Sequence, residues 1–180
     1  MRLWLFGSLG FAGFSILVFL GLARSRPEHA AIIVSLMPLV TALANWVAHG
    51  HRPSTATLAA TIVALVGVLL VITKGDLQTF AGGTLHADLL VLAGVVCWIA
   101  YTMGAATLPR FSSLRYTAHS MAFGSLTIIA VTLAASAAGY ARPPAPEVVR
   151  SFAAEILCLS AVAGVLAVLG WNAGIGLLGH

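Results

Sequence analysis

Long apolar runs alternate with short polar breaks along the whole chain. The first run covers residues 3–23 and contains no charged side chain. At 1.5 Å per residue, a helix of that length reaches about 31 Å, which matches the thickness of a bilayer's hydrocarbon core. The same pattern recurs along the chain. It predicts about six transmembrane helices, at residues 3–23, 29–49, 55–73, 88–108, 116–140 and 152–178.

These runs favour helices over strands. A strand of a membrane barrel needs only about 9–11 residues, and its side chains alternate between apolar and polar. The runs are about twice that long and lack the alternation. Because every backbone amide needs a partner in lipid, uniformly apolar runs must form helices. The sequence therefore predicts an all-α polytopic membrane protein.

The polar breaks contain residues that end helices. Residues 50–53 combine glycine and proline in a predicted tight turn, and the three prolines of residues 142–146 are expected to end the fifth helix. The longest break before a span, residues 74–86, contains two consecutive glycines. It is the predicted boundary between two halves of the molecule. These halves are residues 1–80 and residues 81–180, with three transmembrane helices each.

Composition excludes a water-soluble protein. The chain is 60% hydrophobic and 8% charged, whereas about a quarter of the residues in a soluble domain are charged. The net charge of +4 comes from Lys and Arg scattered at segment ends without a basic stripe, so we do not expect nucleic acid as a partner. Cys97 and Cys158 both lie in apolar runs and are interpreted as small core residues. We expect neither a metal nor a cofactor.

Polar and aromatic side chains within the runs are candidates for a substrate cavity. Pro38 lies midway along the second run, where it should kink the helix beside Ser35 and free a carbonyl. A packing kink without a ligand role is an equal alternative. Trp98 lies deep in the fourth run and is the better cavity candidate among the tryptophans, although tryptophans often serve as interface anchors.

Two other side chains leave alternatives open. Asn172 could contact substrate, but a hydrogen bond to a neighbouring helix is slightly favoured. Imidazole changes charge near neutral pH, so His119 suits a proton-linked step; an interfacial histidine with a satisfied ring is the favoured alternative. No carboxylate lies near the middle of a run, and no Walker A, HExxH or GxSxG motif occurs. The sequence thus gives no support for an enzyme.

Several short motifs are recognisable within these runs. They are residues 19–22, 37–41, 50–52 and 67–70, then residues 87–93 and 97–101, and finally residues 170–175 with 178–179. The first set resembles the third to fifth helices of the EamA-type drug/metabolite transporters, with their central proline. The second resembles the opening of that family's second half, and the third resembles its eighth helix. His51 stands where the family pattern has a glutamate.

The resemblance implies two inverted repeats of five helices around a central cavity. This chain would be the middle portion, truncated at both ends, and Arg2, Arg52, Arg110 and Arg115 would be cytoplasmic. The resemblance also implies export of small metabolites, such as amino acids or amphipathic drugs, by alternating access in the bacterial inner (plasma) membrane. The residues that it places at the cavity are Pro38, Trp98, Tyr101, Trp171 and Asn172.

The expected partners are the lipid bilayer and a small-molecule substrate. The sequence does not decide whether the chain also forms a homodimer. The alternative function is an intact six-helix membrane scaffold or assembly subunit without transport activity.

Overall fold

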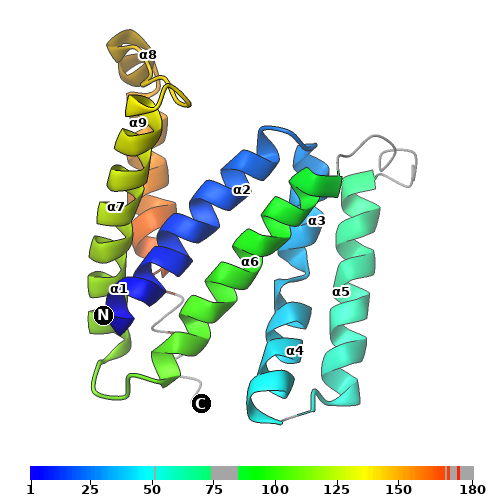
Figure 1. Ribbon diagram of the computed structural model, residues 1–180. Helices are drawn as coiled ribbons and strands as arrows, with labels where there is room; N and C mark the ends of the chain where they lie inside the picture. Colours follow the sequence, from blue (N-terminus) through cyan, green and yellow to red (C-terminus); the bar gives the residue numbers. More distant parts are fainter. Residues whose placement is uncertain (51, 74–84, 169, 171–173, 175–180) are drawn as a thin grey trace. The chain divides into compact units, whose positions relative to one another are not determined.

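The computed structural model describes residues 1–50, 52–73, 85–168, 170 and 174. Within these ranges the chain forms helices joined by turns, and no strand occurs there, which confirms the all-α fold class. The elements in chain order are α1 (Arg2–Gly7), the π-helix η1 (Ser8–Gly13), α2 (Phe14–Leu22), α3 (Pro27–Ser35), α4 (Met37–His49), α5 (Thr55–Thr73), α6 (Leu85–Ala106), α7 (Ser113–Ala137), α8 (Pro146–Ser151), α9 (Ala153–Cys158) and the π-helix η3 (Leu159–Leu166) (Figure 1).

Length and composition identify candidate membrane spans among the described helices. Three are long and apolar enough to cross a bilayer, namely Arg2–Leu22, Leu85–Ala106 and Ser113–Ala137. The bent pair α3 and α4 makes a fourth if it is counted as one span. Thr55–Gly67 and Ala153–Leu166 are shorter apolar stretches. The chain is therefore a multi-pass α-helical membrane protein, and the count of six spans stays a prediction.

The chain divides into two compact units, and the first contains Met1–Ser8 and Gly104–His180. In this unit α1 packs against α7, and Gly7 lies directly on the backbone of Ser120. Thr127 of α7 adds hydrogen bonds to this packing of α1 against α7. The Trp4 Nε1–H donates to its Oγ1 over 2.9 Å, and the hydroxyl groups of Ser8 and Thr127 lie 2.7 Å apart.

The second unit, Leu9–Met103, contains a close antiparallel pair formed by η1 and α2 with α6 (Figure 1). Three glycines allow the approach. Gly10 lies against the ring of Tyr101, Gly21 lies against Val91, and Gly94 lies against the backbone of α2. A Cβ at any of these positions would overlap an atom of the facing helix, so only glycine permits this spacing.

The predicted kink beside Ser35 is confirmed. Helix α3 ends at Ser35 and α4 begins at Met37, with a bend of 41° between them. Pro38 provides no N–H for the hydrogen bond that would continue the helix. The Ser35 hydroxyl donates to the carbonyl of Ile32 over 2.6 Å, which also favours a bend. At the other end of α4, Gly50 adopts a left-handed conformation with φ of 73°, as the predicted tight turn requires.

The predicted end of the fifth helix is wrong by a few residues. Helix α7 covers Ser113–Ala137 rather than residues 116–140. It begins early because the Ser112 hydroxyl accepts a hydrogen bond from the backbone N–H of Arg115, and it ends early because Gly139 turns left-handed with φ of 77°.

One of the three prolines that were expected to end the fifth helix lies in the next helix. Pro146 opens α8, where a missing N–H costs nothing because the first helical turn leaves its N–H groups unpaired. Helix α8 is thus an additional short helix, and Phe152 separates it from α9. The apolar helix itself begins at Ala153, close to the predicted residue 152.

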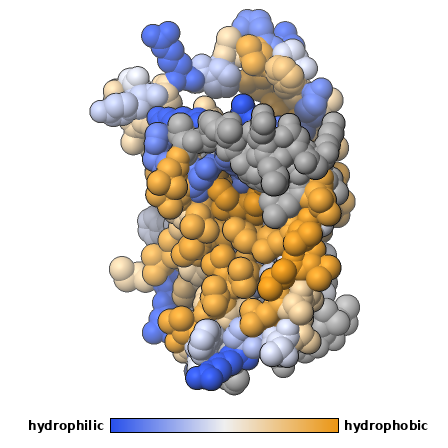
Figure 2. All heavy atoms as spheres, turned by 90° about the vertical axis from the view of Figure 1, so that its right-hand side faces the viewer, coloured by the Kyte–Doolittle hydropathy of each residue, from blue (hydrophilic) through white to orange (hydrophobic). Residues whose placement is uncertain are grey.

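Helix α5 presents an apolar surface that is exposed in the described part of the chain. Ile62, Val63 and Leu70 are 60%, 71% and 60% exposed. Figure 2 shows apolar side chains over the middle of the face that α5 contributes to. A soluble protein rarely leaves such a surface open, so the surface is typical of a membrane protein.

Candidate functional site

Four aromatic rings of the second unit meet where η1 and α2 face α6. We call Phe11, Phe14, Trp98 and Tyr101 the aromatic cluster. The ring centroids of Phe11 and Tyr101 are 5.1 Å apart, and those of Phe14 and Trp98 are 5.4 Å apart. Trp98 and Tyr101, both on α6, lie at 5.3 Å. The interplanar angles of 65°, 51° and 49° are the tilted arrangements that the ring quadrupoles favour.

Local sequence explains how the cluster forms. Phe11 belongs to the π-helix η1, and Phe14 begins α2 immediately after it. Single π-helical turns occur often at functional sites, because they change the direction of the side chains relative to a regular α-helix. Gly10 makes room for the ring of Tyr101, which is only 2% exposed. Trp98 is half-buried, so part of its ring remains accessible.

The structure brings together only part of the predicted cavity set. Trp98 and Tyr101 are neighbours in the aromatic cluster, whereas Pro38 is exposed on α4. Trp171 and Asn172 lie outside the described residues. That these five residues line a substrate cavity stays a prediction.

His119 lies on the exposed surface of α7. Its Nδ1 is 2.7 Å from the carbonyl oxygen of Arg115, one turn earlier in the same helix. The ring also makes an edge contact with Phe111, with centroids 6.0 Å apart. These contacts fit the favoured alternative of an interfacial histidine, and a proton-linked role stays a prediction.

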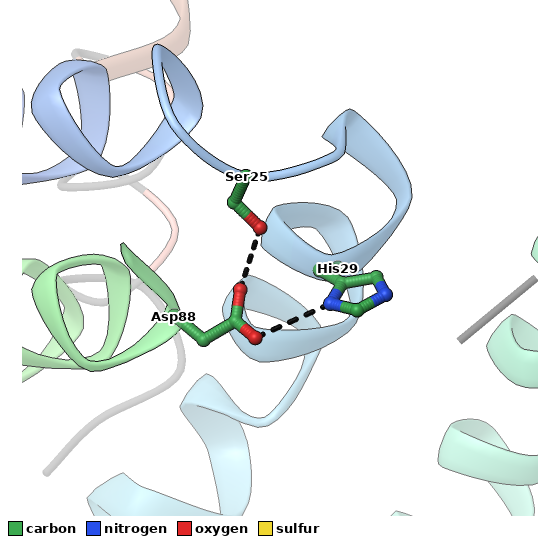
Figure 3. Close-up of polar contacts among 3 residues, drawn as sticks. All are labelled: Ser25, His29 and Asp88. Carbon is green, nitrogen blue, oxygen red and sulfur yellow. Dashed lines mark hydrogen bonds and ion pairs between the residues drawn. The ribbon is translucent and has the colours of Figure 1, made fainter. Parts of the chain in front are cut away.

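A cluster of three polar side chains was not expected from the sequence. Asp88, in the first turn of α6, accepts a hydrogen bond from the Ser25 hydroxyl over 2.6 Å, and its other carboxylate oxygen lies 3.2 Å from Nδ1 of His29 (Figure 3). We call Ser25, His29 and Asp88 the Asp88 cluster. It joins the α2–α3 turn and the first turn of α3 to the start of α6.

Sequence reasoning missed partners in both clusters. Phe11 and Phe14 belong to a run without charged residues that also contains other aromatic side chains, so nothing distinguishes them before the helix pair is known. For Asp88 a weak signal exists. Alternating spans place residues 24–28 and the start of the fourth run at the same side of the membrane, where Ser25 and His29 are polar residues within reach.

The apolar helices and their lipid-compatible surface define a multi-pass membrane protein, and comparisons with known proteins identify its family. Residues 1–73 match the EamA-like transporter family. The uncharacterized transporter YrdR of Bacillus subtilis is 31% identical over 179 residues, which cover 97% of this chain and 56% of the relative. Residues 1–73 thus belong to the EamA-like transporter family, and nearly the whole chain is similar to a transporter of about twice its length.

Two further relatives agree with this assignment. The uncharacterized transporter YyaM of Bacillus subtilis is 32% identical over 71% of this chain and 42% of its own length. An uncharacterized transporter of Archaeoglobus fulgidus is 29% identical over 85% of this chain and 51% of its own length. The chain thus spans about half the length of the curated relatives that it matches. No solved structure matches significantly.

The family favours a transporter over an enzyme. The division into residues 1–80 and 81–180 stays a prediction.

Proposed function

We propose that this chain is part of a secondary transporter that exports small metabolites, such as amino acids or amphipathic drugs, from bacteria across the inner (plasma) membrane by alternating access. Membership of the EamA-like family and the names of the relatives support transport. The observation that carries the proposal in the structure is the aromatic cluster, because it places a partly accessible tryptophan on a helix of membrane-spanning length.

The rings of the cluster suit an amphipathic substrate. An aromatic face attracts cations and also buries apolar groups, so one surface can accept both ends of such a molecule. Trp98 is the accessible member and would contact the substrate. The buried Tyr101 and the two phenylalanines would hold the Trp98 ring in place. The kinked helix at Pro38 would supply a second edge of the cavity.

The test is efflux by the full-length gene product with Trp98 changed to alanine. Cells are preloaded with ethidium, as an amphipathic dye, or with radiolabelled phenylalanine, and the rate of loss is measured. Trp98→Ala should lower efflux by about tenfold, the loss expected when one cation–π or stacking contact of about 1.4 kcal/mol is removed. Its amount in the membrane should stay unchanged.

The matched control is Trp46→Ala, which removes an exposed tryptophan from α4. This variant should export at the wild-type rate. Unchanged efflux in Trp98→Ala would remove Trp98 from the substrate site. If the wild-type protein moved neither probe nor any amino acid offered, the alternative of a membrane scaffold would be preferred.

A further inference from the structure

We propose that a pocket of the first unit binds an anionic phospholipid, with the lipid phosphate at Arg2 and the apolar part of the lipid against Trp4 and Phe123. The pocket is separate from the aromatic cluster, which belongs to the second unit. The proposal concerns lipid binding and does not rest on the proposed transport activity.

The pocket is formed by three segments, namely the start of α1, the turn after α6, and α7. Its volume is about 360 Å³, which lies within the range of about 300–1,000 Å³ that is usual for small-molecule sites. Among the described lining residues, Arg2 alone has a charged side chain, and the others are apolar or aromatic. The lining residues are Met1, Arg2, Leu3, Trp4, Leu108 and Phe123. This arrangement suits a molecule with a charged end and an apolar body.

The aromatic wall of the pocket is held in place by the packing of α1 against α7. The rings of Trp4 and Phe123 stack, with centroids 6.1 Å apart and an interplanar angle of 19°. Because the Trp4 N–H is donated to Thr127, the orientation of the indole is fixed. Trp4 is nevertheless 54% exposed. A ligand therefore meets an apolar surface that is already ordered, which lowers the entropic cost of binding.

Each lining segment lies where an apolar stretch meets a polar one. Arg2 directly precedes the uncharged run of residues 3–23. Leu108 follows the end of α6, in the polar turn before α7. Phe123 lies one turn after His119, beyond which α7 contains no charged or titratable side chain. In a bilayer this is the boundary between the headgroups and the hydrocarbon core, where tryptophan is enriched and phospholipid is the abundant amphipathic neighbour.

Charge selects among the phospholipids. A guanidinium stays charged and binds phosphate through paired N–H donors. Among the described residues Arg2 has no ion-pair partner, and neither acidic residue of the first unit, Glu147 or Glu155, lines the pocket. Phosphatidylcholine would bring its own ammonium group close to Arg2, and no carboxylate lines the pocket to neutralise it. An anionic headgroup such as that of phosphatidylglycerol is therefore preferred.

The test is native mass spectrometry of the full-length protein in detergent, with phosphatidylglycerol and phosphatidylcholine of identical acyl chains added in equal amounts. The wild type should prefer phosphatidylglycerol about fivefold, which corresponds to about 1 kcal/mol from one arginine near an anionic lipid. Arg2→Gln should lose this preference, and Arg2→Lys should keep most of it because the charge remains. The matched control is Arg150→Gln, which removes the same charge from α8 of the same unit, outside the pocket. It should bind as the wild type does.

A second variant tests the space of the pocket instead of its charge. Leu108→Trp fills the pocket and leaves Arg2 in place, so its preference for phosphatidylglycerol should fall to that of Arg2→Gln. The two variants change different properties, so either one decides the question if the other does not fold. Equal binding of both lipids by the wild type would overturn the proposal, as would a full preference in Arg2→Gln or in Leu108→Trp.

A soluble anion is the alternative occupant. Glycerol 3-phosphate carries the phosphate of the lipid without its acyl chains and therefore cannot cover the aromatic wall. At about tenfold excess it should leave phosphatidylglycerol bound to the wild type, since most of the pocket lining is apolar. Displacement of the lipid by glycerol 3-phosphate would assign the pocket to a soluble anion and would also overturn the proposal.

Discussion

Glycines, whose side chain is a single hydrogen atom, decide how closely the helices of the second unit approach. Gly10 lies against the ring of Tyr101, and a methyl group there would overlap the ring atoms. In contrast, a Cβ at Gly67 on α5 would meet no described atom within 4 Å. The same residue type is thus a packing requirement at one position and is replaceable at the other.

Gly10→Ala should therefore destabilise the full-length protein, whereas Gly67→Ala should not. Overpacking costs about 1–3 kcal/mol, which would lower the melting temperature in detergent by several degrees. Gly67→Ala should leave it unchanged or raise it slightly, because alanine is the better helix former. Equal melting temperatures for the two variants would contradict the tight contact at Tyr101.

At the scale of elements, polar groups on α7 add to the packing of α1. Thr127 accepts the Trp4 N–H and meets the Ser8 hydroxyl, while it also donates to the carbonyl of Phe123 over 3.0 Å. Hydrogen bonds between membrane helices contribute about 0.6 kcal/mol each on average. Two of them therefore supplement a contact whose closeness comes from Gly7 and Ser120.

Thr127→Val keeps the shape of the side chain and removes the contacts with Trp4 of α1 and Ser8 of η1. We expect a loss of about 1 kcal/mol in unfolding free energy, from two bonds of this kind. Urea or SDS titration of the full-length protein measures it, with the exposed Thr132 on the same helix as control. Thr132→Val should have no comparable effect, and a similar loss in both variants would show that the hydrogen bonds of Thr127 are not responsible.

How far each element could be predicted depends on whether its cause is local. Helices follow from the length of apolar runs because lipid leaves the backbone no other partner. The kink follows from two local features, the missing N–H of Pro38 and the Ser35 hydroxyl. The ends of helices are harder to predict. Ser112 caps the start of α7, and Gly139 ends the helix before the prolines of residues 142–146. The pairing of Phe11 with Tyr101 depends on contacts between distant segments, which no local pattern contains.

For the whole molecule, successive spans must place successive connections on opposite sides of the membrane. The described helices include three to four candidate spans, so the six-helix interpretation requires a direct test. Charge alone does not orient the chain, because the basic residues are divided almost evenly between the two sides.

Single cysteines at Arg26, Arg52, Arg110 and Arg142 test this topology in a full-length protein with Cys97→Ala and Cys158→Ala. A maleimide that does not cross membranes should label positions 26 and 142 in intact cells, and positions 52 and 110 only after the cells are opened. This outcome follows if the family's orientation holds. Labelling of positions 26 and 52 from the same side would exclude a span at residues 29–49.

The contact of η1 and α2 with α6 also limits the ways in which the protein can move. Sliding one helix along the other by one turn would bring residues with side chains to the positions that Gly21 and Gly94 now occupy, where a Cβ would come closer than 3.0 Å to the facing helix. The two helices must travel together as one rigid body. A spectroscopic label on the lipid-facing side of either helix would then report the displacement of both.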